Sequence, residues 1–140
     1  MSNDFPVTIY HNPACGTSRN TLAMIEAAGY RPTVVEYLKT GWTRQTLEAL
    51  LAEMNAKPRD VLRRKGAPAA ELGLLEPDVG DDRILDAMVA HPILVERPIV
   101  VTPKGTKLSR PSELVLDLLE RSPASFTKED GQVVIPAKHD

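Results

Sequence analysis

The chain has 140 residues, of which 42% are hydrophobic and 26% are charged, a composition typical of one soluble globular domain. Lysine and arginine number 17 and aspartate and glutamate 19, so the formal net charge of −2 excludes a global basic field for binding nucleic acid. Residues 1–12 lack the cationic and apolar regions of a signal peptide, and no apolar run approaches the roughly 18 residues of a membrane span. We therefore expect a cytoplasmic protein that binds neither nucleic acid nor membranes.

The N-terminal part of the chain predicts a βαβ unit. β-Branched residues with partial alternation are typical of strands, and apolar residues spaced three and four apart indicate an amphipathic helix. The predicted elements are a strand over Val7–Tyr10, a turn-rich loop over His11–Gly16, a helix that starts near Thr17 or Ser18 and stops at Gly29, and a strand over Thr33–Tyr37. The loop follows the carboxyl end of the first strand, the edge at which open α/β sheets bind ligands.

Residues 43–91 predict a helical block without a strand. The first expected helix is capped by Thr43 and reaches about Met54. The second is a short helix opened by Pro58 that carries Val61, Leu62, Arg63 and Arg64. The third is capped by Asp81 or Asp82, contains Ile84, Leu85 and Met88, and ends before Pro92.

Strand character returns towards the C-terminus. The expected elements are a strand over Pro98–Thr102, a turn at Pro103–Gly105, a second hairpin arm over Thr106–Ser109, a helix from Pro111 to Leu119, and a polar tail from Ser122 with a short strand at Val133–Ile135. This order predicts an α/β fold of the thioredoxin-like type: a mixed β-sheet flanked by helices, with a helical insertion between the second and third strands. We expect a single domain over residues 1–140, with a core at about 5–42 and 92–121, an insertion at about 43–91 and a tail at 122–140.

Cys15 is the only cysteine of the chain, which excludes an internal disulfide and a cysteine-based zinc site. It lies just before a predicted helix, whose free N–H groups and dipole favour a thiolate. His11, if protonated, and Arg19 in the first helical turn would add positive charge. We therefore predict a nucleophile that is substantially ionised at neutral pH, although a free cysteine has a pKa near 8.5. Any redox cycle needs a second sulfur from another molecule.

Three kinds of site compete for this loop. A dithiol oxidoreductase would carry Cys-x-x-Cys, but Ser18 stands where the resolving sulfur would be, so a mixed disulfide could form here and not be resolved internally. A cysteine phosphatase loop needs an arginine six positions after the cysteine, whereas Arg19 follows Cys15 more closely. The third possibility is an anion site at a helix N-terminus with a thiolate at its centre.

An anion site needs further cations, and two arginines occupy informative positions. Arg97 and Arg110 each precede a proline at an element boundary, where the backbone is extended and the side chain can reach a site. The planar guanidinium fork suits a tetrahedral oxyanion. The pattern alone does not choose between Arg63 and Arg64 as a third cation.

The segment His11–Leu22 closely resembles the active-site loop of the glutaredoxin-linked arsenate reductases. The resemblance covers nearly the whole chain, in family order, through the blocks His91–Leu94, Arg97–Pro103, Leu108–Glu113 and Phe126–Gly131. It implies a thioredoxin-like fold with a helical insertion and the reduction of arsenate to arsenite. This sequence departs from the family's pattern in the short tail Gln132–Asp140.

The resemblance also implies roles for individual residues. Cys15 would be the nucleophile and His11 the residue that helps to keep it ionised, with an arsenate-binding triad of Arg63, Arg97 and Arg110. The supporting loop is Asn12, Gly16, Thr17, Ser18 and Arg19, and Pro98 is the candidate for a cis peptide bond. No metal or bound cofactor is implied: glutathione is the co-substrate, glutaredoxin the protein partner, and a monomer is expected.

Two other functions stay open at this point. The first is a related glutathione-dependent thiol reductase that acts on another substrate. The second is a non-enzymatic thioredoxin-fold regulator that binds a protein partner such as RNA polymerase. Such regulators typically switch through Cys-x-x-Cys, and Ser18 argues against an internal switch.

Overall fold

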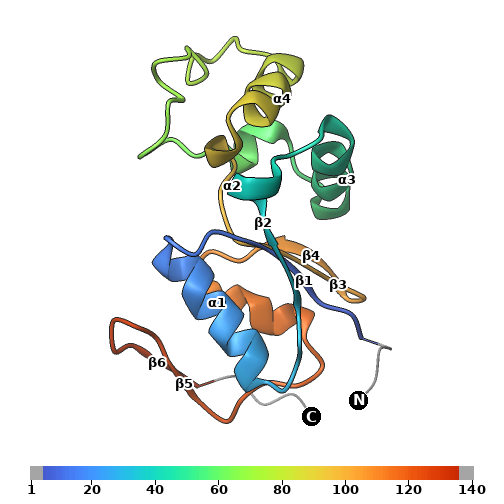
Figure 1. The fold of residues 1–140 in the computed structure, drawn as a ribbon, viewed down its shortest axis with the longest axis vertical. Coiled ribbons are helices and arrows are strands. Elements are labelled where there is room, and N and C mark those ends of the chain that lie inside the picture. Colours follow the sequence, from blue (N-terminus) through green and yellow to red (C-terminus); the bar gives the residue numbers. More distant parts are fainter. Residues whose placement is uncertain (1–4, 136–140) are drawn as a thin grey trace. The chain divides into compact units, whose positions relative to one another are not determined.

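The structure is a computed structural model that describes residues 5–135. The chain forms two compact units. The sheet unit comprises Met1–Glu36 and Arg97–Asp140, and the helical unit comprises Tyr37–Glu96 (Figure 1). The helical unit is thus an insertion between the second and third strands of the sheet.

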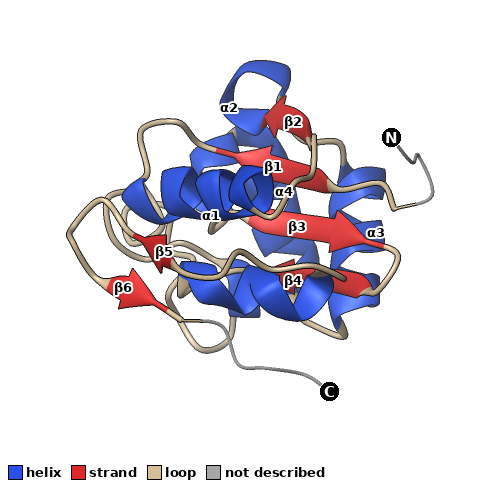
Figure 2. Ribbon diagram, turned by 90° about the horizontal axis from the view of Figure 1, so that it is seen from below, coloured by secondary structure: helices blue, strands red, loops and turns tan. Residues whose placement is uncertain are grey.

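The sheet unit contains a four-stranded mixed sheet in the order β2-β1-β3-β4. Its strands are β1 (Thr8–His11), β2 (Thr33–Glu36), β3 (Ile99–Thr102) and β4 (Gly105–Leu108). β1 runs parallel to β2 and antiparallel to β3, and β3 forms a hairpin with β4 (Figure 2). The thioredoxin-like fold and the four main strands expected from the sequence are confirmed.

The core of the sheet unit lies between the sheet, α1 (Gly16–Ala27) and the 3-10 helix η3 (Ser112–Leu118). Ile9 and Val100 contribute from the strands and Met24 and Ile25 from α1, each with no exposed surface. This packing holds the N-terminus of α1 beside the carboxyl end of β1, and the Cys15 loop joins the two.

The ends of α1 differ slightly from those expected. The helix begins at Gly16 with Cys15 as its N-cap, one or two residues before the predicted start. It ends at Ala27 with Ala28 as its C-cap, and the predicted stop, Gly29, follows directly with a φ of 95° that favours glycine. β2 ends at Glu36 rather than Tyr37, because Tyr37 begins the short helix α2 (Tyr37–Thr40).

The helical unit contains α2, α3 (Arg44–Met54), η1 (Pro58–Val61), α4 (Asp81–Ala90) and η2 (Pro92–Leu94). The Thr43 cap is confirmed, since its side chain accepts a hydrogen bond from the backbone N–H of Thr46 at 3.1 Å. The predicted cap at Asp81 or Asp82 is wrong. Gly80 is the N-cap of α4, and both aspartates lie in the first turn, where their charges complement the helix dipole.

The predicted helix from Pro58 to Arg64 is also wrong in its second half. η1 stops at Val61, and Leu62 pairs with Val95 in an antiparallel bridge. The backbone N–H of Arg63 donates to Leu94 O at 2.7 Å, and that of Glu96 donates to Val61 O at 2.8 Å. These bonds pair the segment with a distant part of the chain, so it leaves the helical conformation.

The C-terminal elements are shorter than expected. The predicted helix from Pro111 to Leu119 is the 3-10 helix η3, with extended residues at both of its ends, Pro111 and Leu119. The expected strand at Val133–Ile135 is β6 (Val133–Val134), which pairs with β5 (Phe126–Thr127), a strand that the sequence pattern did not reveal. We call residues 126–134 the C-terminal hairpin.

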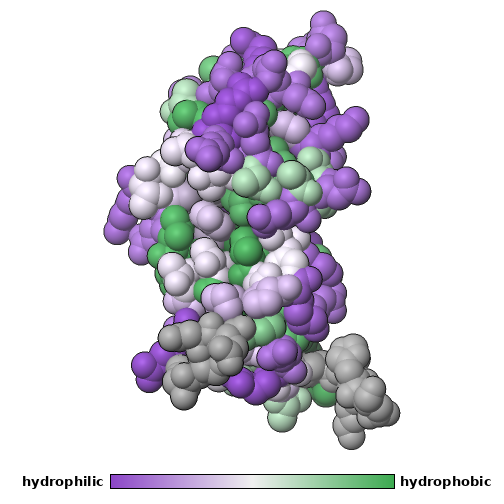
Figure 3. Space-filling model, turned by 90° about the vertical axis from the view of Figure 1, so that its right-hand side faces the viewer, coloured by the Kyte–Doolittle hydropathy of each residue, from purple (hydrophilic) through white to green (hydrophobic). Residues whose placement is uncertain are grey.

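Hydrophilic residues cover most of the face drawn in Figure 3, with fewer hydrophobic residues between them. The large hydrophobic side chains that are exposed among the described residues are Val34, Leu38, Val89, Val133 and Ile135. No helix in the described part of the chain is long and apolar enough to cross a membrane.

Removing the Thr43 cap tests the local account of α3. Thr43→Ala leaves the Thr46 N–H without its side-chain acceptor, and we expect the free energy of unfolding to fall by about 1 kcal/mol. Thr43→Ser keeps the capping oxygen and serves as the matched control. Denaturant unfolding measures both variants, and equal losses would show that the cap contributes nothing.

Candidate active site

Cys15 lies at the N-terminus of α1 and is 9% exposed. Its own N–H donates to Asn12 O at 3.0 Å, and the N–H of Ala14 donates to Asn12 Oδ1 at 2.9 Å. These bonds fold residues 12–15 into a compact turn that ends in the helix. The thiol therefore sits where unpaired helical N–H groups are available to an anion.

Two arginines of the sheet unit reach this thiol from the far part of the sequence. Arg110 Nη1 donates to Cys15 Sγ at 3.7 Å and to Arg97 O at 3.0 Å. Arg97 is 6% exposed, and its charge acts on Cys15. The peptide bonds Arg97–Pro98 and Arg110–Pro111 are both cis. The structure thus brings together three of the residues expected from the sequence.

The surroundings of Cys15 hold the pKa of its thiol below the ordinary value. Burial alone would raise that pKa, because it disfavours the charged thiolate. A hydrogen bond from the Ser18 backbone N–H, the charge of Arg97, and hydrogen bonds from the side chains of Arg97 and Arg110 outweigh burial. These donors and the positive charge favour the thiolate form of Cys15, which is the nucleophilic form of a cysteine.

His11 acts on the site through Ser18. Its Nδ1 is hydrogen-bonded to Ser18 Oγ at 2.6 Å, and the Asn12 N–H donates to the same Oγ at 3.0 Å. Burial lowers the pKa of His11, Glu36 and Glu26 oppose the shift, and Arg19 adds to it. Burial thus favours the neutral form of His11, whose ring is hydrogen-bonded to Ser18.

Ser18 stands where a dithiol enzyme has its second sulfur, and it is completely buried. Its hydroxyl joins His11 to the backbone of the loop, and its backbone N–H faces Cys15. The residue therefore organises the loop without supplying a resolving thiol.

The other members of the predicted supporting loop lie around the helix start. Thr17 O accepts a hydrogen bond from Thr21 Oγ1 at 2.8 Å, inside the first turns of α1. An added Cβ on Gly16 would lie 3.7 Å from Arg19 Nη2, an ordinary van der Waals distance, so this contact does not itself require glycine. Arg19 Nη1 donates to Pro13 O at 2.8 Å.

Arg19 has a partner that the sequence did not indicate. Its guanidinium binds the carboxylate of Glu129 in the C-terminal hairpin. Local patterning does not reveal this contact, because the two residues are 110 positions apart. The one available signal was that Glu129 lies within the family-like block Phe126–Gly131.

Arg63 and Arg64 belong to the helical unit. Arg63 Nη1 lies 3.8 Å from Glu96 Oε1, its side chain is 22% exposed, and Arg64 is exposed. The assignment of Arg63 as a third arsenate-binding arginine therefore rests on the resemblance and remains a prediction.

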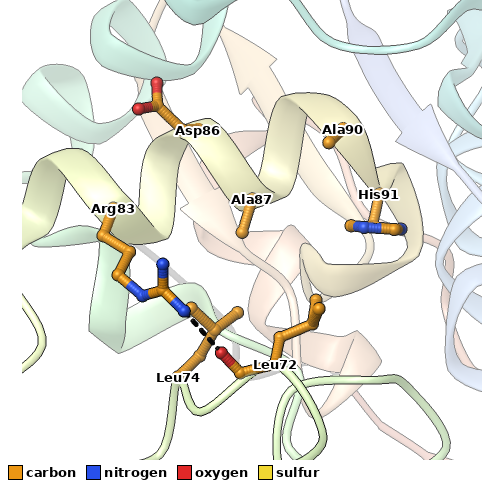
Figure 4. A pocket seen from close by; sticks show the side chains of 7 residues that line it. All are labelled: Leu72, Leu74, Arg83, Asp86, Ala87, Ala90 and His91. Atoms are coloured by element: carbon orange, nitrogen blue, oxygen red, sulfur yellow. Dashed lines mark hydrogen bonds between the residues drawn. The ribbon is translucent and has the colours of Figure 1, made fainter.

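The helical unit also contains a cavity of about 480 Å³. Its lining residues are Leu72, Leu74, Arg83, Asp86, Ala87, Ala90 and His91 (Figure 4). Arg83 Nη2 donates to Leu72 O at 2.8 Å across this cavity, whereas Asp86 points away from Leu72. The lining holds no cysteine, so the chemistry of Cys15 does not take place in it. In residues 5–135, no group of three or more His, Cys, Asp or Glu side chains is placed to hold a metal ion.

The charge environment of Cys15 predicts a titration that depends on Arg110. We expect the wild-type thiol to ionise below the usual pKa of about 8.5, and Arg110→Ala to raise its pKa because a hydrogen bond to the sulfur is lost. The pH dependence of the thiolate ultraviolet absorbance measures both, with Cys15→Ser as the blank. A wild-type pKa above the usual value would contradict this account.

Comparison with known proteins places these residues in a family. The ArsC family model matches residues 10–118. The arsenate reductase ArsI2 of Synechocystis sp. is 60% identical over 130 residues, which cover 92% of this chain and 93% of that protein. The arsenate reductase of Escherichia coli K12 is 54% identical over 136 residues, covering 96% of this chain and 94% of that protein. The solved arsenate reductase from Vibrio cholerae superposes with a TM-score of 0.79 at 40% identity, covering 84% of this chain and 100% of that one. The chain belongs to the ArsC family.

Proposed function

We propose that this protein reduces arsenate to arsenite, with glutathione and glutaredoxin as its thiol donors. The observation that carries the proposal is the contact of the Arg110 guanidinium with the Cys15 sulfur at 3.7 Å, beside the charge of Arg97. A nucleophile and an oxyanion-binding cation therefore lie in contact at a helix N-terminus. The high identity to named arsenate reductases supports the same substrate.

Binding of arsenate follows from charge and shape. Arsenate at neutral pH is a tetrahedral anion, and guanidinium groups donate paired hydrogen bonds to such oxyanions. Arg97 and Arg110 hold it next to Cys15, the N–H groups at the start of α1 contribute further donors, and Arg63 is the third arginine of the proposal. Neutralising the substrate charge lets an anionic thiolate approach an anion.

The first chemical step forms a bond between sulfur and arsenic. The Cys15 thiolate attacks As(V), and one arsenate oxygen leaves as water after taking up protons from solvent. The product is a covalent Cys15 thioester of arsenate that still contains As(V). Low thiol pKa helps this step, because it supplies the thiolate at neutral pH.

The second step transfers the electrons. A glutathione thiolate attacks the sulfur of Cys15, and the sulfur–arsenic electron pair stays on arsenic, so that As(V) becomes As(III) and leaves as arsenite. Cys15 and glutathione are oxidised together to a mixed disulfide. A glutaredoxin thiolate then takes the glutathione, and Cys15 leaves as a thiolate ready for the next turnover. Because Ser18 cannot resolve the mixed disulfide, the external thiol is required.

This cycle uses thiols alone and needs no bound metal or organic cofactor. It also supports a cytoplasmic location, since glutathione keeps thiols reduced there. A monomer remains the proposed oligomeric state.

Replacing the nucleophile tests the proposal directly. Cys15→Ser should abolish arsenate-dependent oxidation of NADPH in an assay coupled through glutathione, glutaredoxin and glutathione reductase. The wild-type rate should vanish when either glutathione or glutaredoxin is omitted. Circular dichroism should show that the variant remains folded. Turnover by Cys15→Ser, or a wild-type protein with a reactive Cys15 and no arsenate-dependent signal, would contradict the proposal.

The role of Arg110 predicts a specific failure of a conservative change. Arg110→Lys keeps the positive charge but lacks the planar fork, so we expect kcat/KM for arsenate to fall by about 10-fold or more, and further in Arg110→Ala. Arg31→Ala removes an exposed arginine of the same unit and is the matched control. Full activity of Arg110→Lys would show that charge alone is sufficient.

A further inference from the structure

The C-terminal hairpin reaches the start of α1, close to the loop that carries Cys15 (Figures 1 and 2). Its turn is closed by two backbone bonds, from Lys128 N–H to Gln132 O at 2.8 Å and from Gly131 N–H to Lys128 O at 2.9 Å. Glu129 lies within this turn, and its N–H donates to Asn20 Oδ1 at 3.0 Å. The turn therefore lies against α1 through its backbone as well as its side chains.

The Arg19 guanidinium joins the hairpin to the Cys15 loop, and each of its three nitrogens donates a hydrogen bond. Nε donates to Glu129 Oε2 at 2.8 Å and Nη2 to Glu129 Oε1 at 2.9 Å, which is a bidentate pair. Nη1 donates to Pro13 O at 2.8 Å. One planar group thus connects a carboxylate of the hairpin with the carbonyl two residues before Cys15.

The hairpin does not need this ion pair in order to dock. Phe126 and Val134 pack against the core of the sheet unit. Lys128 Nζ lies 2.6 Å from Glu113 Oε1 of η3, and the Lys128 side chain is only 10% exposed. The Arg19–Glu129 pair is itself about half exposed, at 43% and 50%, and such pairs contribute little to stability. We therefore expect the ion pair to affect the position of the Cys15 loop and not the stability of the fold.

The Pro13 carbonyl is the part of the loop that this pair controls. Asn12 holds the N–H groups of Ala14 and Cys15, whereas Pro13 has no N–H and is exposed. Arg19 fastens Pro13 through its carbonyl, and the bidentate carboxylate fixes the plane of the guanidinium. A guanidinium without its carboxylate can rotate away, because the long arginine side chain has many rotamers.

We propose that Glu129 is a positioning residue for the reaction: it orients Arg19, and Arg19 fixes the loop from which the Cys15 thiolate attacks. The inference rests on the proposed function, in which Cys15 is the nucleophile. Glu129 touches neither the sulfur nor the arginines that bind arsenate, so it acts only through Arg19. Arg19 and the thiolate also influence each other, since the charge of Cys15 adds to the rise in the pKa of Arg19 that the hydrogen bond and charge of Glu129 mainly cause.

The first test is Glu129→Gln, which keeps the side-chain shape and removes the charge and one acceptor. Small displacements of a nucleophile cost large factors in rate, so we expect kcat to fall by about 10-fold. KM for arsenate should stay within about twofold, because Arg97 and Arg110 are untouched. Asp117→Asn breaks an exposed ion pair with Lys107 of 2.9 Å elsewhere in the sheet unit and is the matched control, with kcat unchanged.

The second test shows whether Glu129 acts through Arg19. We expect the double variant Arg19→Gln/Glu129→Gln to lose no more activity than Arg19→Gln alone, because the second change removes a residue whose effect is already lost. Glu129→Asp keeps a carboxylate and should recover part of kcat. Thermal unfolding verifies that each variant is folded. Additive losses in the double variant, or a wild-type kcat in Glu129→Gln, would overturn the proposal.

The third test uses neither arsenate nor glutathione. The thiol pKa of Cys15 is read from the pH dependence of its alkylation by iodoacetamide. Removing the negative charge of Glu129 by itself would lower this pKa, whereas a loosened loop weakens the bonds to the sulfur and raises it. A rise in Glu129→Gln supports positioning, and a fall or no change refutes it. This pKa measurement does not depend on turnover. If the wild type fails the arsenate assay, the proposed function is refuted, but the pKa result still tests whether Glu129 positions the loop.

Discussion

The site depends above all on the donors and positive charge that lower the pKa of the Cys15 thiol. A sulfur that is 9% exposed would ordinarily stay protonated, since burial disfavours its charge. The effect of burial is offset by a helix N-terminus and by two arginines that are distant in sequence but lie beside Cys15. The mixed sheet makes this possible, because β1 lies between β2 and β3, and β3 begins at Ile99, two residues after Arg97. The fold thereby joins residues that are far apart in sequence.

The sequence predicted much of this arrangement because several signals agree. β-Branched strands, a loop of turn residues and periodic apolar positions identified the βαβ unit, and the two Arg-Pro pairs marked element boundaries. The resemblance in the Cys15 loop then connected these parts to one chemistry. The prediction was wrong in one segment. Pro58 begins a helix that ends already at Val61, because backbone hydrogen bonds between Val61–Arg63 and Leu94–Glu96 draw the chain out of the helical conformation. No pattern within the segment itself reports such a distant partner.

The site was predictable in its residues more than in their protonation and partners. The sequence allows His11 to add positive charge if it is protonated, and the structure adds that burial lowers its pKa and that its ring is hydrogen-bonded to Ser18. From the sequence, Ser18 shows only that the loop has no second sulfur. The structure adds that Ser18 supplies a buried hydroxyl and an N–H directed at Cys15. Burial and hydrogen-bond direction are properties of the folded chain, so neither follows from residue type and spacing.

The long separation between Arg19 and Glu129 has a kinetic meaning. Contacts between residues 110 positions apart close late in folding, after local helices and hairpins have formed, because the entropy of closing a long loop must first be overcome. The sheet, α1 and both arginines lie upstream of the C-terminal hairpin in the chain. The contact of Arg110 with Cys15 spans 95 positions and is of the same long-range kind. The loop and the thiol of Cys15 therefore both depend on contacts with residues about a hundred positions away, so neither arrangement can form from the N-terminal segment alone.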